Sequence, residues 1–168
     1  MKVYISGKIG EEVISDKTRE KFARAERMLL ECGKFVEVFN PTDADWQENL
    51  QHTYDYAFRV NGSMMDRYTF YLMKDLQKLA YYKTVYMLKD WKQSPGATAE
   101  YHTAMAMKKR MFFQSRFDAC EHLCHRMWQE VQSGHPPKGY LDMDSNDAEL
   151  MYIHDHIDEA WLPIPETP

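Results

Sequence analysis

Residues 85–100 read Val85-Tyr86-Met87-Leu88-Lys89-Asp90-Trp91-Lys92-Gln93-Ser94-Pro95-Gly96-Ala97-Thr98-Ala99-Glu100. The first four are apolar and rich in β-formers, so they predict a buried strand that ends in a polar turn. Ser94 suits the N-cap of a helix, and Pro95 suits the next position, where no amide donor is needed. The pattern predicts a helix that runs to Arg110, with Glu100 in its second turn.

A helix that begins at the carboxyl end of a parallel strand presents unpaired amide groups and the positive end of its dipole. In open α/β sheets this is where anionic ligands bind. A carboxylate such as Glu100 beside such a site calls for a chemical explanation.

The composition of the 168 residues sets broad limits. The length suits one domain with a sizeable core, and the net charge of −5 with a pI near 5.8 argues against a general nucleic-acid binder. Three cysteines, and an opening strand where a signal peptide would stand, favour a reducing cytoplasm. No apolar run approaches the roughly 20 residues that span a bilayer, so we expect no membrane segment.

Alternating strand and helix patterns predict a Rossmann-like, three-layer α/β domain with a parallel sheet of four or five strands. The expected strands are 2–7, 35–39, 82–88 and 111–113, and the expected helices between them are 15–32, 65–80 and 94–110. Residues Gly7–Gly10 form either a phosphate-binding loop or a plain strand-to-helix connection, since their spacing fits no known phosphate motif.

Two further segments are less regular. Residues 42–64 mix Trp46 and other aromatic residues with acids and amides, and we interpret them as a long loop with helical pieces; a helix packed on the sheet edge is the alternative. Residues 116–133 predict an amphipathic helix with Phe117, Leu123, Met127 and Trp128 on its apolar face, and 144–159 predict a last acidic helix before a proline-rich tail.

Two groups of residues resemble metal sites. Cys120 and Cys124 fall on the apolar stripe of the expected helix, whereas His122 and His125 fall largely off it, so the four residues do not converge. The acidic histidine run 154–159 is most simply a solvated helix face. We therefore expect neither a metal nor another cofactor.

Asp75 and Glu100 are the stronger pair. Both are carboxylates on helices that flank the same expected strand, and two carboxylates around one sugar carbon are what glycosidic cleavage requires. From spacing alone, the simpler explanation is that these acids complement helix dipoles.

A resemblance to a known family favours catalysis. The segments Lys2–Gly7, Asn40-Pro41, Asp75-Leu76 and Asp90-Trp91, followed by Ser94-x-Gly96-Ala97-x-x-Glu100, resemble the nucleoside 2-deoxyribosyltransferase superfamily, most closely its small phage and bacterial branch. The resemblance covers residues 1–114, which we expect to form the α/β domain, and leaves 115–168 as a helical C-terminal extension. The sequence departs from that branch at Tyr82-Lys83, where an aspartate is common.

The resemblance implies a role for each matching residue. Glu100 would be the nucleophile, Asp75 would assist the base or its proton, and Tyr4 would orient the glutamate. A serine at position 94 is typical of relatives that act on 5′-monophosphates, whereas those acting on free nucleosides have an acid there. The other implied substrate-binding residues are Gly7, Asn40, Asp90, Trp91 and Gly96.

The expected function is therefore cleavage of the N-glycosidic bond of a 2′-deoxyribonucleoside or its 5′-monophosphate, with hydrolysis or base transfer as the outcome. A nucleotide-binding module without turnover is the alternative. Relatives generally form homo-oligomers, so we expect one here, with the C-terminal helix packed on another subunit. The competing possibility is that this helix covers an edge or face of its own sheet.

Overall fold

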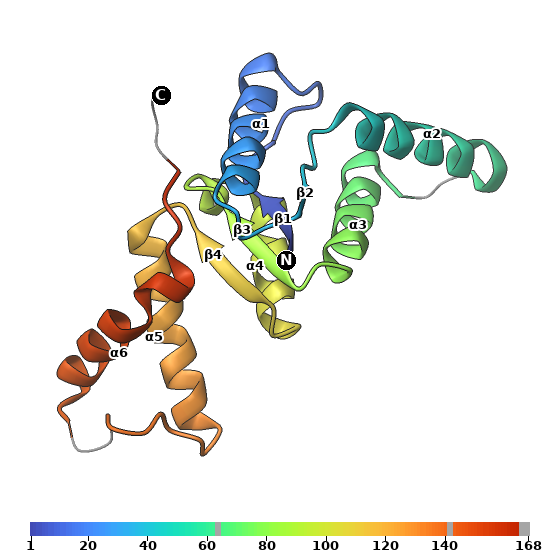
Figure 1. Ribbon diagram of the computed structural model, residues 1–168. Helices are drawn as coiled ribbons and strands as arrows, with labels where there is room; N and C mark the ends of the chain where they lie inside the picture. Colours follow the sequence, from blue (N-terminus) through green and yellow to red (C-terminus); the bar gives the residue numbers. More distant parts are fainter. Residues whose placement is uncertain (63–64, 141–142, 165–168) are drawn as a thin grey trace. The chain divides into compact units, whose positions relative to one another are not determined.

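The computed structural model of the protein describes residues 1–62, 65–140 and 143–164. Figure 1 shows its elements, which are β1 (Lys2–Ser6), α1 (Asp16–Glu31), β2 (Glu37–Phe39), α2 (Ala44–Asn61), α3 (Arg67–Ala80), β3 (Thr84–Met87), the 3₁₀ helix η1 (Trp91–Gln93), α4 (Pro95–Ala106), β4 (Arg110–Phe113), α5 (Arg116–Gln132) and α6 (Ser145–Ala160).

The strands form one parallel sheet in the order β2-β1-β3-β4. Strand β1 lies in its interior, with Val3 opposite Val38 of β2 and Tyr4 opposite Val85 of β3. Buried Val3, Tyr4 and Ile5 make β1 apolar on both faces, as a strand covered on both sides must be. The predicted Rossmann-like α/β fold is confirmed, with four strands.

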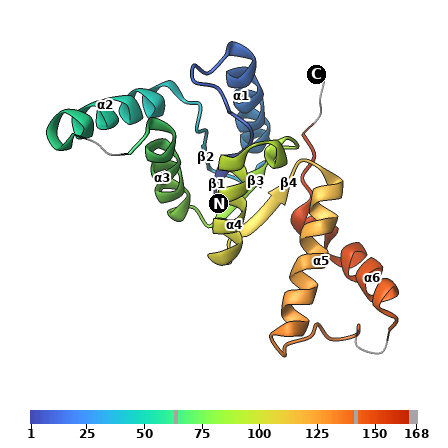
Figure 2. The same cartoon turned by 180° about the vertical axis from the view of Figure 1, so that it is seen from behind.

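The strand order explains where the helices lie. From β1 the chain goes to one neighbour, β2, and later returns past β1 to the other side, β3. Right-handed crossovers in opposite directions place α1 on one face of the sheet and α3 and α4 on the other. In Figures 1 and 2, α1 and α4 accordingly lie on opposite sides of the strands.

The chain divides into two compact units, and the boundary between Met111 and Phe112 falls inside β4. In the second unit α5 packs on α6, and Arg126 donates from Nε to the Tyr152 hydroxyl at 2.8 Å. The apolar face of α5 thus finds a partner within its own chain. No helix in the described ranges combines the length and apolar character needed to cross a bilayer.

The predicted composition of the α5 face was partly wrong. Leu123 and Met127 are buried, but Phe117 is 69% exposed and Trp128 is 38% exposed. His122, expected off the stripe, is buried against the ring of Phe113 at a centroid distance of 5.1 Å. The buried face is therefore rotated from the predicted one toward His122.

The loop predicted for residues 42–64 was also wrong, because the alternative, a helix, is what forms. Asp43 caps α2 by accepting from the amides of Asp45 and Trp46, and the helix ends at Gly62, whose φ of 57° is left-handed. Ser63 and Met64 lie outside the described residues. The helix after Ser94 is shorter than predicted: it ends at Ala106, and Arg110 already begins β4.

Gly7 follows β1 at a point where the backbone has no room for a side chain. A Cβ added there would lie 2.7 Å from Leu88 Cδ1 and 2.9 Å from Leu88 Cβ. At Gly96 the nearest atom, the Tyr68 hydroxyl, would be 3.5 Å away, which is ordinary contact. Gly7 is therefore required by packing, whereas Gly96 is not.

We expect Gly7→Ala to lower the free energy of unfolding by about 1–3 kcal/mol, because it overpacks a rigid site. Gly96→Ala is the matched control and should be neutral or slightly stabilising in a helix. Urea denaturation of both variants measures the difference. Equal stability of the two variants would contradict this account of Gly7.

Candidate functional site

The site begins with the N-terminus of α4. As predicted, Ser94 is its N-cap: Oγ accepts from the Ala97 amide at 3.3 Å, and Pro95 occupies the first helical position. One turn later Glu100 points into the protein, and only 7% of the residue is exposed. A carboxyl group in such a place needs hydrogen bonds to offset the loss of water.

Both oxygens of Glu100 receive hydrogen bonds from the end of β1. The Tyr4 hydroxyl donates to Oε1 and the Ser6 hydroxyl donates to Oε2, each at 2.5 Å. Tyr4 and Ser6 are two apart on a strand, so their side chains share one face of the sheet, the face covered by α4. The carboxyl group is therefore held in a fixed orientation.

Burial dominates the protonation of Glu100. Desolvation and the nearby charge of Asp75 raise its pKa to about 8, although the hydrogen bonds from Ser6 and Tyr4 act in the opposite direction. Desolvation and Glu100 also raise the pKa of the Tyr4 hydroxyl, which therefore stays a donor. The proton on Glu100 is thus exchanged near neutral pH.

Asp75 comes from the middle of α3. Burial raises the pKa of its carboxyl group to about 7, against the opposing effect of the Trp46 indole N–H, which donates to Oδ1 at 2.9 Å. Two carboxyl groups in the same pocket therefore titrate close to pH 7, in a range where each could give or accept a proton during a reaction.

An aromatic cluster joins the supports of the two acids. The ring of Phe39 stacks on Tyr4 at 5.1 Å and meets Trp46 edge-on at 5.2 Å, centroid to centroid. Tyr82 lies edge-on to Tyr4 at 6.1 Å, and its hydroxyl donates to Glu37 at 3.0 Å. Tyr82, the position where the resemblance departs, thus packs directly on the tyrosine that holds Glu100.

Glu100 and Asp75 open onto a cavity of about 470 Å³, large enough for a ligand of nucleoside size. Apolar groups from α3, from α4 and from the loops after β1 and β2 line it, and so do polar side chains from α2 and α3. The lining is Gly7, Ile9, Gly10, Glu11, Glu12, Ile14, Pro41, Gln47, Arg67, Tyr68, Tyr71, Leu72, Asp75, Ser94, Gly96, Ala97 and Glu100.

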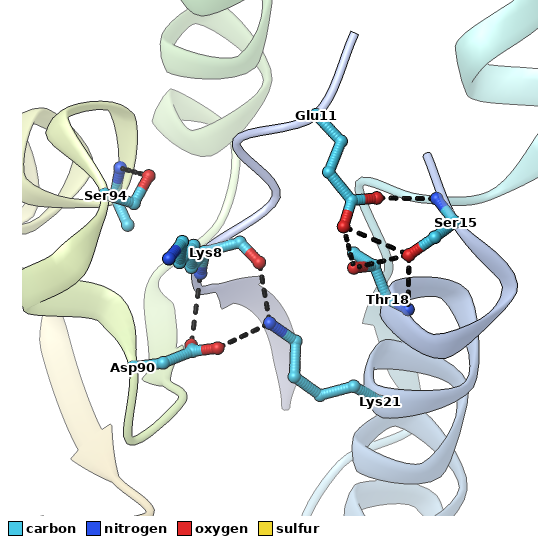
Figure 3. Close-up of polar contacts among 8 residues, drawn as sticks. Lys8, Glu11, Ser15, Thr18, Lys21, Asp90 and Ser94 are labelled. Carbon is cyan, nitrogen blue, oxygen red and sulfur yellow. Dashed lines mark hydrogen bonds and ion pairs between the residues drawn. The ribbon is translucent and has the colours of Figure 1, made fainter. Parts of the chain in front are cut away.

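One wall of the cavity is the loop between β1 and α1. Figure 3 shows how its ends are held: the Lys8 amide donates to Asp90 Oδ1 at 3.1 Å, and the Lys21 ammonium donates to the Lys8 carbonyl at 2.6 Å. Farther along, Glu11 accepts from the Ser15 amide at 2.6 Å.

The structure brings most of the predicted site residues together. Asp75, Glu100, Ser94, Gly7 and Gly96 line the cavity, and Tyr4 lies behind Glu100 as a hydrogen-bond donor.

Three predicted binding residues lie outside the lining. Asn40 accepts from the Thr42 amide and so shapes the turn after β2. Asp90 binds Lys8 and Lys21, and Trp91 is buried in a stack with Tyr101 at 4.5 Å.

Residues 1–113, which include the whole cavity lining, match the family described as Domain of unknown function (DUF4406). The chain belongs to the DUF4406 family. No significant match was found among curated proteins or among solved structures.

Several residues of this DUF4406 site were not predicted. Ser6 follows the expected strand pattern, and its contact with Glu100 depends on the packing of α4 over β1. Arg67, Tyr68 and Tyr71 line the cavity from the first turns of α3. Trp46 reaches Asp75 from α2, where the sequence predicts a loop. The aromatic content of residues 42–71 was the available signal.

Within residues 1–62, 65–140 and 143–164, no group of three or more histidine, cysteine or acidic side chains could hold a metal ion. Cys120 and Cys124 are half-buried on α5.

The raised pKa of Glu100 links the site to stability. A carboxyl group that holds its proton more tightly in the folded state stabilises that state below its unfolded pKa, and this contribution is lost as pH rises toward 8. We expect Glu100→Gln, which does not titrate, to gain unfolding free energy relative to wild type between pH 5 and pH 8.5, by on the order of a few kcal/mol.

Urea denaturation at several pH values measures this difference. Glu20→Gln, on the exposed face of α1 with a side chain 72% exposed, is the control and should follow wild type. A Glu100→Gln curve parallel to wild type would mean that the folded protein does not hold this proton.

Proposed function

We propose that the protein cleaves the N-glycosidic bond of a 2′-deoxyribonucleoside or of its 5′-monophosphate, as a nucleoside 2-deoxyribosyltransferase-like enzyme. The observation that carries the proposal is the pair Glu100 and Asp75: two carboxyl groups with raised pKa values face one cavity of nucleoside size. Such pairs are typical of glycosidic cleavage.

In the first step, a carboxylate oxygen of Glu100 attacks C1′ while the bond between C1′ and the base nitrogen breaks. The base leaves with the electron pair of that bond, and Asp75 gives its proton to the base. Tyr4 and Ser6 each occupy one lone pair of the Glu100 oxygens and leave the others free. They fix the direction of attack without blocking it.

In the second step, water attacks C1′ of the glycosyl intermediate, Glu100 leaves as a carboxylate, and Asp75 takes a proton from the water. The products are then the free base and the deoxyribose or its 5-phosphate. If a second base attacks in place of water, the same groups carry out base transfer. Either outcome restores the starting protonation of the pair.

Two features support a phosphate on the substrate. Ser94 accepts from Ala97 and keeps its own hydroxyl proton to donate into the cavity, at a helix N-terminus that favours anions. Arg67 adds a cation to the lining, whereas Glu11 and Glu12 oppose it. Comparing a deoxynucleoside with its monophosphate decides between the two substrate classes.

A binding module without turnover is the second candidate, favoured by one observation. With a pKa raised to about 8, Glu100 is largely protonated at pH 7 in the ligand-free protein, and a protonated carboxyl group does not attack carbon. Such a module would bind a nucleotide and release no base.

A homo-oligomer remains our expectation. Its support is α2, where Tyr56 and Val60, four residues apart and therefore on one face of the helix, are both more than half exposed. Contiguous exposed apolar groups of this kind are common at contacts between subunits.

We expect Glu100→Gln to abolish the release of free base while leaving the fold and ligand affinity largely intact, because amide and carboxyl groups are nearly isosteric and only the carboxylate attacks C1′. Chromatography of the products from deoxynucleosides and their monophosphates measures release, and calorimetry measures affinity. Glu20→Gln should retain full activity. Undiminished turnover by Glu100→Gln would contradict the assignment.

The reaction needs Glu100 ionised and Asp75 protonated, so kcat/KM should form a bell with its limbs near the two pKa values, about 7 and 8. Asp75→Asn should reduce the rate about 10²–10⁴-fold and remove the alkaline limb. A profile of unchanged shape would contradict this assignment of Asp75.

A further inference from the structure

We propose that Asp90 and Lys21 are positioning residues that clamp the Gly7–Ile14 loop in place as a wall of the cavity. The inference deepens the proposed function, since the wall would contact the substrate of that site. The two residues come from different elements: Asp90 precedes η1 and Lys21 lies on α1.

The clamp acts on the main chain of Lys8. Asp90 Oδ1 accepts from the Lys8 amide at 3.1 Å, and Lys21 Nζ donates to the Lys8 carbonyl at 2.6 Å. The same ammonium pairs with Asp90 Oδ2 at 2.6 Å, with the two side chains only 32% and 22% exposed. The three contacts form a triangle that fixes both the amide and the carbonyl of Lys8 (Figure 3).

A second set of contacts holds the far end of the loop. The Glu11 carboxylate accepts from the Ser15 amide at 2.6 Å and from the Ser15 and Thr18 hydroxyls at 3.0 Å each (Figure 3). These hydrogen bonds lower the pKa of Glu11, so it stays ionised in this role. Glu11 therefore organises the start of α1.

The loop residues near these two points face the cavity. Ile9, Gly10, Glu12 and Ile14 line it, and Gly10 makes its turn at a φ of 59°, which disfavours any residue with a Cβ. The two isoleucines supply much of the apolar lining on this side. The position of Ile9 depends on Lys8, the residue before it, and Ile14 stands next to Ser15 in the second set of contacts.

Unlike an ordinary surface ion pair, the clamp requires an acceptor and a donor at fixed positions. Position 90 must supply an acceptor for an amide and position 21 must supply a donor for a carbonyl. Exchanging the two charges would preserve the attraction between the side chains. It would, however, place a lysine against the Lys8 amide and an aspartate against the Lys8 carbonyl, and neither could form a hydrogen bond there. A charge swap therefore separates the clamp from simple electrostatic attraction.

The test uses the full chain with Asp90→Leu, which removes the acceptor, Lys21→Met, the conservative Lys21→Arg, and the swap of Asp90→Lys with Lys21→Asp. The control is Glu20→Gln, which breaks an exposed pair with Arg27 on the same helix α1. Amide hydrogen exchange, followed by mass spectrometry of the peptide that covers residues 7–15, reports on the loop directly. Steady-state kinetics of base release report on its effect.

We expect Asp90→Leu and Lys21→Met to speed amide exchange in the loop by about tenfold, because each removes a hydrogen bond that opposes opening of the loop. KM should rise by about tenfold and kcat should change less than about twofold, since a wall contributes equally to binding of the ground state and the transition state. Lys21→Arg should keep both values near wild type, the swap should behave like Lys21→Met, and Glu20→Gln should match wild type.

Unchanged exchange in Asp90→Leu and Lys21→Met would overturn the proposal, and so would wild-type exchange in the charge swap. Lower stability without faster exchange in the loop would also overturn it, since that is the behaviour of a merely structural ion pair. If the wild-type protein releases no base, the proposed function fails, while hydrogen exchange still decides the clamp.

Discussion

The structure depends on a buried carboxyl group, Glu100, that bridges α4 and the end of β1. Tyr4 and Ser6 can donate to it only if α4 crosses that face of the sheet with its second turn above them. A buried carboxyl group without such partners would be strongly unfavourable. The contact therefore fixes how α4 sits on β1, and it fixes the orientation of the group that we propose to be the nucleophile.

This arrangement has a cost in stability that a purely structural role does not explain. Burial raises the pKa values of both Glu100 and Asp75, so each carboxyl group is easier to ionise in the unfolded chain than in the folded one. Acids held in this way are characteristic of functional sites, where stability is lost in exchange for reactivity.

Features set by local sequence could be predicted. Ser94-Pro95 specifies a helix start through its own hydroxyl and fixed φ, and α4 begins there. The strand β1 and the helix α1 were likewise readable from apolar runs and from Gly33, because these signals need no distant partner. The prediction that Asp75 and Glu100 share a pocket followed from topology, since elements that flank one parallel strand converge at its carboxyl end.

Features that depend on tertiary contacts could not be predicted. The aromatic residues of α2 follow no clean period, because part of the helix is exposed and Trp46 is directed at Asp75. On α5, the polar His122 is buried while the apolar Phe117 is exposed. This outcome depends on which side of the helix packs against Phe113 and α6. Ser6 and Asp90 gain their roles only through partners at least 69 residues away in the sequence.

Three consecutive residues at the end of β1 connect the chemistry with the cavity wall. The Ser6 hydroxyl donates to Glu100, and the Ser6 carbonyl accepts from the Leu88 amide at 2.8 Å. Gly7 packs against Leu88 with no space for a side chain, and the Lys8 amide donates to Asp90. Each therefore contacts the segment from the end of β3 to α4. A shift of that segment would move the Glu100 carboxyl group and the loop after β1 together, so these two sides of the site keep their relative position. A fixed relative position is what holds a substrate carbon against the proposed nucleophile.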